Sequence, residues 1–148
     1  MSETATYAVP SDRLYDGAQH LWVQHDPAAS HVTVGLDALG LASMGDLAYV
    51  TLRPTGTAVR RGEPIGSLEA AKMTGDLVAP VSGTLVACNA AVLRDPTLIN
   101  RDPYGDGWLV TIAPADWEGE SAALVAGAAL PEWVAAETER YRTQGWIV

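Results

Sequence analysis

The chain of 148 residues contains a single lysine, Lys72, which stands between Glu69 and Asp76 in the stretch "SLEAAKMTGD". The chain has nine basic residues, and all of them except Lys72 are arginines. A solvated positive charge can come from either residue, but only lysine offers an amine that can be acylated or can form a Schiff base. The sequence therefore makes Lys72 the first candidate for chemistry.

Three uses of the Lys72 amine are open. A solvated surface charge is the commonest use of a lysine. A Schiff base needs a lowered amine pKa, and the carboxylates of Glu69 and Asp76 oppose this because they favour the ammonium form. Covalent acylation fits better, since the small neighbours Ala70 and Ala71 leave room around the amine. The acylated stem would be a neutral arm that carries a group between active sites.

The composition limits the other functions. There are 18 acidic and 9 basic residues, for a net charge of −9, so we expect neither a nucleic-acid nor a membrane partner. The sequence lacks both a secretory pattern at its start and an apolar run of spanning length, which predicts a cytoplasmic protein. We expect the lone Cys88 to be buried as a small apolar side chain. The spacing of His20, His25 and His31 fits no metal site.

The middle of the chain predicts short strands, and its end predicts helix. The expected strands are rich in β-branched residues and bounded by turn residues; they cover 31–36, 46–52, 83–88 and 107–113. A short helix over 37–45 should end at Gly45. A later helix should begin near Pro131 and end before Gly145, with arginines in its last turn.

A faint internal repeat surrounds the lysine. "GTAV" at 56–59 and "GTLV" at 83–86 have the same form, and Lys72 lies close to midway between them. Two similar halves joined by a hairpin would place the lysine at the hairpin tip. Four-residue matches also arise by chance, so two unrelated strand starts are an equally acceptable interpretation.

The stretch over 66–83, "GSLEAAKMTGDLVAPVSG", resembles the lysine hairpin of lipoyl and biotinyl carrier domains. Glu69 precedes the lysine by three residues, and Gly83 follows it by eleven. The resemblance implies that lipoate is attached to Lys72. It also implies that Glu69, Asp76 and Gly83 shape the hairpin that the lipoate-attaching ligase or transferase recognises.

The flanking segments resemble the H protein of the glycine cleavage system over roughly residues 20–130, with "DPYGDGW" at 102–108 as the most characteristic segment. The implied fold is mainly β, a lipoyl/biotinyl barrel-sandwich hybrid with C-terminal helices. We expect a single lipoyl-carrier domain over 1–148. Its core would cover about 20–115, its lysine hairpin 66–83, and a C-terminal helical extension about 120–145.

Two departures from the family pattern bear on the cargo. Met73 after the lysine is typical of biotin carriers, so biotin and a biotin carboxyl carrier domain stay as alternatives. His20-Leu21-Trp22 replaces the family's His-Glu-Trp. That glutamate helps to hold a cationic aminomethyl group, and leucine cannot pair with a cation. We therefore lean to a paralogue whose arm carries sulfur for a heterodisulfide-reductase-like complex in sulfur oxidation.

The sequence thus predicts a swinging-arm carrier protein rather than an enzyme. His20, Leu21, Trp22 and Asp76 are expected to form a resting cleft for the arm. The partners would be the attaching enzyme, dihydrolipoamide dehydrogenase, and either the sulfur complex or, as the alternative, the glycine cleavage enzymes. The final stretch, "PEWVAAETERYRTQGWIV", either packs over a sheet edge or docks a different partner.

Overall fold

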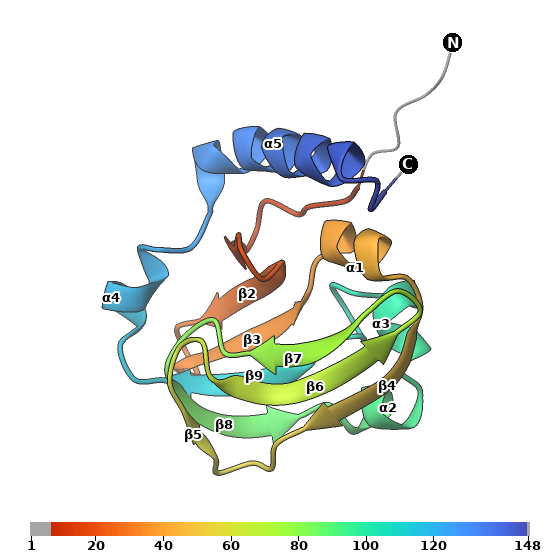
Figure 1. The fold of residues 1–148 in the computed structure, drawn as a ribbon. Coiled ribbons are helices and arrows are strands. Elements are labelled where there is room, and N and C mark those ends of the chain that lie inside the picture. The colour runs from red at the N-terminus through yellow and green to blue at the C-terminus, as the bar shows by residue number, and fades with distance from the viewer. Residues whose placement is uncertain (1–6, 148) are drawn as a thin grey trace.

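A computed structural model describes residues 7–147 of the chain, and its strands form two antiparallel sheets (Figure 1). The six-stranded sheet has, in spatial order, β1 (Leu14–Asp16), β2 (Leu21–Asp26), β3 (His31–Leu36), β9 (Val110–Pro114), β8 (Gly83–Cys88) and β5 (Ala58–Val59). The three-stranded sheet has β4 (Leu47–Leu52), β6 (Pro64–Ala70) and β7 (Thr74–Val78). The mainly β barrel-sandwich predicted from the sequence is confirmed.

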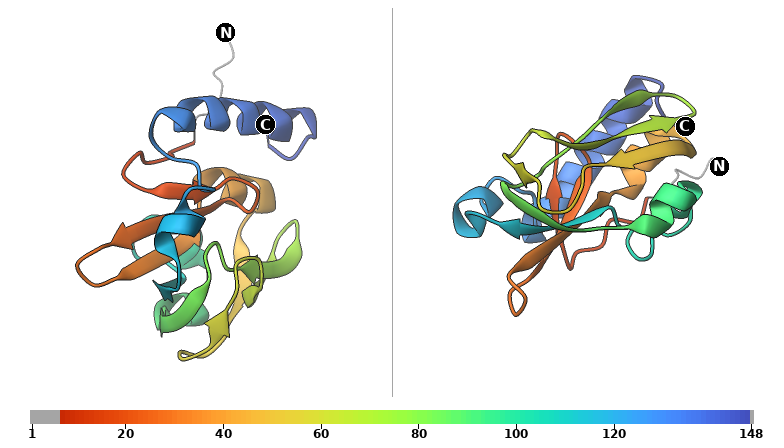
Figure 2. Two further views of the ribbon diagram at one scale, coloured as in Figure 1. Left: turned by 90° about the vertical axis from the view of Figure 1, so that its left-hand side faces the viewer. Right: turned by 90° about the horizontal axis from the view of Figure 1, so that it is seen from below.

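The helices lie at the ends and on one side of the two sheets (Figure 1). They are α1 (Ala38–Met44), α2 (Ala90–Arg94), α3 (Thr97–Arg101), α4 (Trp117–Ser121), the 3-10 helix η1 (Gly127–Ala129) and α5 (Leu130–Thr143). Figure 2 shows α5 running across the top of the molecule, with α1 between it and the sheets. No helix within residues 7–147 is both long enough and apolar enough to cross a membrane.

The main core fills the space between the two sheets. Alternate residues of each strand point into it, as the two-residue period of a half-buried strand requires. The six-stranded sheet contributes Val34, Leu85 and Ile112, while the three-stranded sheet contributes Ile65 and Leu77, and all of these are at most 3% exposed. This shared core fixes β6 and β7, and therefore the hairpin between them.

The two halves of the predicted repeat pair with each other. β5 and β8 are antiparallel, with Ala58 opposite Thr84 and Val59 opposite Gly83. The pairing continues into the preceding turn, because Gly56 donates to the carbonyl of Leu85. Antiparallel pairing of like segments places them about a local two-fold axis, and the hairpin of β6 and β7 lies between them in the chain.

The helix α1 has the boundaries that its sequence predicts. The buried Asp37 side chain accepts a hydrogen bond from the backbone N–H of Gly40, which caps the start of the helix. Gly45 follows its end with a φ of 81°, a conformation that glycine adopts without steric cost. The strand predicted over 107–113 begins later, at Val110, because residues 102–107 are folded into turns that hydrogen-bond to Asp102.

The chain folds back after α5 through two hydrogen bonds that define a Schellman motif. The N–H of Trp146 donates to the carbonyl of Tyr141, and that of Gly145 donates to the carbonyl of Arg142. Gly145 takes a φ of 77°, which explains the glycine at this position. The reversal brings Ile147 against Leu39 and Tyr141 in a small apolar cluster, so the tail is anchored onto α1.

His20 links the start of α1 to α5 through ion pairs with Asp37 and Glu137. Its Nδ1 lies 2.9 Å from a carboxylate oxygen of Asp37, and its Nε2 lies 2.9 Å from one of Glu137. Ionised carboxylates only accept hydrogen bonds, so both ring nitrogens donate and the ring is an imidazolium. Burial by itself would lower the pKa of His20, but Asp37 and then Glu137 outweigh burial and raise that pKa. The ring also stacks on Trp133 at 5.2 Å.

This network predicts how stability depends on pH. Because the folded-state pKa of His20 is raised, its contribution is complete below the unfolded value of about 6.5 and is lost as pH rises through the folded value. The other groups that face the ring keep their charge states there: Glu137 has a lowered pKa, and burial raises the pKa of Tyr141 to about 12. The free energy of unfolding, measured with urea at a series of pH values, should decline as pH rises from about 6.5 through the folded-state pKa of His20.

The matched variant is His20→Asn, because asparagine tolerates the φ of 56° found at this position. At pH 6 it should be less stable than the parent by about 3 kcal/mol, since the buried carboxylate of Asp37 loses its cationic partner. The decline with pH should largely disappear in this variant. A decline of unchanged size in His20→Asn would show that another group causes it.

Candidate functional site

Lys72 lies in the turn between β6 and β7, as the sequence predicts (Figure 1). The N–H of Ala70 donates to the carbonyl of Met73 at 2.8 Å and closes the turn, and Glu69 pairs with Thr74 just below it. Residues 71–74 are all exposed. The turn therefore presents the lysine side chain at the end of a rigid two-stranded support.

The turn is tied to the end of α1. The N–H of Lys72 donates to the carbonyl of Met44 at 2.9 Å, and the N–H of Ala71 donates to that of Asp46 at 3.0 Å. The last carbonyls of a helix lack partners within it, so the turn satisfies one that would otherwise need water. Gly45 allows this approach, because a Cβ there would come within 3.1 Å of the Ala71 side chain. The lysine backbone is thus held from two sides.

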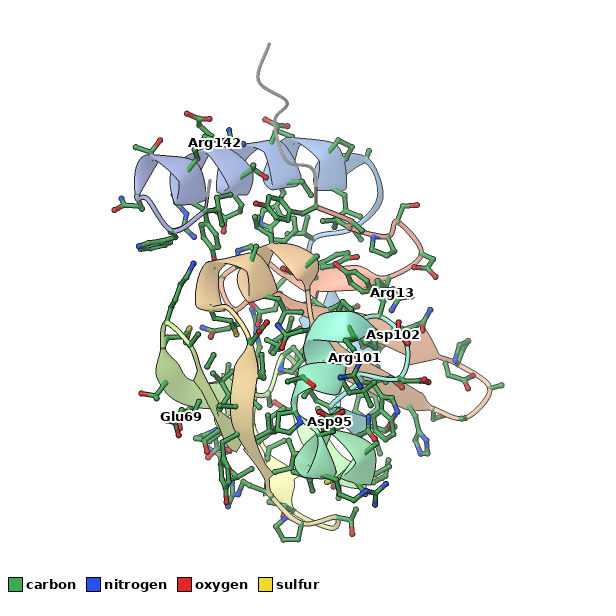
Figure 3. The ribbon with its side chains drawn as sticks, turned by 90° about the vertical axis from the view of Figure 1, so that its right-hand side faces the viewer. Arg13, Glu69, Asp95, Arg101, Asp102 and Arg142 are labelled. Atoms are coloured by element: carbon green, nitrogen blue, oxygen red, sulfur yellow. The ribbon has the colours of Figure 1, made fainter. Side chains whose placement is uncertain are left out.

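The acidic neighbours of the lysine lie on the open face of the hairpin. Figure 3 shows Glu69 directed outward, and Asp76, opposite Ser67 in the register, is also exposed. No ion pair within residues 7–147 involves Lys72, Glu69 or Asp76. The amine is therefore available to a modifying enzyme, with both carboxylates displayed beside it.

Gly83 is placed away from the turn, at the start of β8. A Cβ at this position would lie 2.1 Å from the carbonyl oxygen of Ala113 in β9. The close approach of the two strands therefore requires glycine here. Packing thus explains this residue, and the part in ligase recognition that the resemblance implies stays a prediction.

The predicted resting cleft is only partly assembled. Leu21 and Asp76 line one small cavity of about 70 Å³, together with Met73; we call it the Leu21 cleft. His20 and Trp22 are 2% and 1% exposed and do not line it. Side chains alternate across a strand, so Trp22 faces the other way from Leu21, and His20 lies just before β2 with a φ of 56°. His20 binds Asp37 and Glu137, and the indole N–H of Trp22 donates to the carbonyl of Pro103.

A larger groove, which sequence reasoning missed, begins at the lysine itself. Its volume is about 400 Å³, and it is lined by Ser43, Lys72, Met73, Tyr141, Gly145 and Trp146; we call it the tail groove. Figures 1 and 3 both show the hairpin tip and the C-terminal end of α5 on the same side of the molecule. The signal in the sequence was an aromatic residue directly after the helix-ending Gly145, which indicates a chain that folds back.

The remaining candidates have structural explanations. His25 stacks on Trp117 with ring centres 4.4 Å apart. No group of three or more potential metal-ligating side chains occurs within residues 7–147. Cys88 is half-buried, rather than fully buried as predicted, and its thiol donates to the carbonyl of Arg53. Burial raises the pKa of this thiol, which disfavours a reactive thiolate.

The residues around Lys72 fit a lipoyl group. Lys72 is exposed and forms no ion pair with any residue over 7–147, its neighbours Ala70 and Ala71 are small, and the tail groove opens beside it. The wall residues of that groove are mostly apolar, as an alkyl chain with a dithiolane ring requires. A neutral amide would replace the ammonium group without leaving a buried charge behind.

Comparison with known proteins gives one consistent family. The glycine cleavage H-protein family matches residues 13–137. The glycine cleavage system H protein of Gloeobacter violaceus is 36% identical over 130 residues, which covers 88% of this chain and 91% of that protein. That of Marinobacter nauticus is 38% identical over 129 residues, which covers 87% of this chain and 97% of that protein.

A solved structure agrees with these relatives. The crystal structure of a glycine cleavage system H protein from Mycobacterium marinum matches with a TM-score of 0.70 and 34% identity, covering 86% of this chain and 98% of that one. The family match ends at Glu137, within α5, so residues 138–148 lie beyond it. The chain belongs to the glycine cleavage H-protein family, whose members carry a lysine-bound lipoate.

Proposed function

We propose that this protein carries its lipoyl group on Lys72 and serves as the mobile carrier between the enzymes of glycine cleavage. The observation that carries the proposal is the single lysine of the chain, exposed in a turn that is tied to α1. When bound, lipoate supplies a disulfide that opens to two thiols, which accept and release a small group. The protein supplies the attachment point and the support.

The residues of the hairpin divide this task. The backbone of Lys72 is fixed by Met44, so the mobility of the arm comes from its side chain and the attached acyl chain. Glu69 and Asp76 mark the face that the lipoate-attaching enzyme approaches. The glycine cleavage enzymes and dihydrolipoamide dehydrogenase would then meet the arm from the same open side.

Lipoate is favoured over biotin by the family as a whole, despite Met73. The lean to sulfur carriage gains no support from the comparisons, since the relatives reported above are glycine cleavage proteins. One observation still favours sulfur carriage as a second candidate. Leu21 is 1% exposed and lines the Leu21 cleft, where Asp76 is the one acidic lining residue among those that the structure describes.

Replacing Lys72 by arginine tests the attachment site. Arginine keeps the charge and the approximate length but has no amine to acylate. The parent protein, incubated with a lipoate ligase, lipoate and ATP, should gain the mass of one lipoyl group, and Lys72→Arg should gain none. Both proteins should unfold at the same temperature, because the Lys72 side chain forms no ion pair within the described residues.

The same incubation with a biotin ligase and biotin is the control for the cofactor. A biotinyl increment in the parent protein, or a lipoyl increment that survives in Lys72→Arg, would contradict the assignment. A parent protein that gains neither a lipoyl nor a biotinyl group would also contradict the assignment.

Replacing Leu21 by glutamate tests the cargo. If the arm carries a cationic amine derived from glycine, a carboxylate at position 21 would pair with it. The amine should then be lost from the arm about tenfold more slowly than in the parent, the factor expected of one hydrogen bond between charged groups. The measurement is the half-time of isotope loss from lipoylated protein loaded by glycine decarboxylase. Leu21→Gln, neutral and of similar size, is the matched control; equal half-times in the two variants would contradict a cationic cargo.

A further inference from the structure

We propose that the tail groove is the resting site of the lipoyl arm in this protein, with Trp146 as the wall against which the dithiolane ring packs. This inference rests on the proposed attachment of lipoate to Lys72. It assigns a ligand-binding role to residues 141–146, all of which lie beyond the family match.

The groove is built by the fold-back after α5. The Schellman motif at Gly145 turns the chain so that the Trp146 ring meets Tyr141 edge-to-face, with ring centres 5.2 Å apart. The guanidinium of Arg140 lies 4.9 Å from the ring centre of Tyr141 and 5.7 Å from that of Trp146. Ile147, 8% exposed, anchors the turn from below. The aromatic wall is therefore held in place from three directions.

The groove starts where the arm starts. Lys72 and Met73 of the hairpin turn line it together with Tyr141, Gly145 and Trp146 of the C-terminal segment. An acyl chain on Lys72 enters the groove directly, without crossing the surface of the protein. Met73 is 42% and Trp146 45% exposed, so two large apolar side chains that line the groove face solvent. An apolar arm between them would remove surface from both.

Size distinguishes the tail groove from the Leu21 cleft. Small-ligand pockets enclose about 300–1,000 Å³, and the tail groove, at about 400 Å³, lies in that range. The Leu21 cleft, at about 70 Å³, lies well below that range. The tail groove is therefore the better match in size for an eight-carbon chain and its ring at rest. Sulfur also packs favourably against aromatic rings, which matches a dithiolane to an indole.

Nuclear magnetic resonance of the unmodified and the lipoylated full chain tests the contact. The indole N–H signal of Trp146, identified by its loss in Trp146→Phe, should shift on lipoylation together with the Met73 methyl signal. The signal of Trp117, which lies in α4 and stacks on His25 of β2, is the internal control and should stay unchanged. An unshifted Trp146 signal would overturn the assignment.

The rate of disulfide reduction tests the protection that the groove provides. A water-soluble phosphine should reduce the lipoyl group of Trp146→Ala about two- to tenfold faster than that of the parent, the factor expected from loss of a sulfur–aromatic contact. Trp146→Phe should remain close to the parent. The control is Leu93→Ala, which removes an equally exposed apolar side chain, 43% exposed, from α2. Equal rates for the parent and Trp146→Ala would overturn the proposal.

The intact mass of each sample separates the two claims. If no lipoyl group is found on Lys72, the proposed function fails and the groove assignment fails with it. If the lipoyl group is present while the Trp146 signal and the reduction rates do not respond, the carrier function stands and only the groove assignment falls.

Discussion

The two hydrogen bonds that join the lysine turn to the end of α1 are the constraint on which the site depends. They use the backbone N–H groups of Ala71 and Lys72 and the carbonyls of Met44 and Asp46. Side chains are not needed for them, so the lysine side chain stays free while its backbone is fixed. A carrier needs this combination, because the arm must move while its base keeps one position that each partner enzyme recognises.

The position of α1 in turn depends on what covers it. Asp37 caps the start of α1 and also binds His20, whose other ring nitrogen binds Glu137 of α5. The tail then folds back onto α1 through Ile147. One buried charge network and one apolar anchor thus hold α5 and the tail beside the hairpin. This arrangement couples the surroundings of the arm to an element that extends beyond the family match.

Local patterns were sufficient for much of this structure. The strands at 31–36 and 83–88 and the helix ended by Gly45 follow from period, turn residues and caps in the sequence, whereas the hairpin around Lys72 was expected from the faint repeat and the family resemblance. The separation of Trp22 from Leu21 was not foreseen, because no strand was expected over the residues of β2. Alternation within β2 puts Trp22 on the other face from Leu21, while His20 lies before the strand and binds Asp37 and Glu137. To predict the tail groove, one must know the direction in which the chain folds back after α5, and no local sequence signal gives that direction.

The central claim is that Lys72 bears the arm that receives a carbon fragment from glycine. The most direct measurement is mass spectrometry of the Lys72 peptide after lipoylated protein has been incubated with isotope-labelled glycine and glycine decarboxylase. We expect the label on the lipoyl group of that peptide. A fully lipoylated peptide that gains no label under conditions in which a known H protein is labelled would contradict the account.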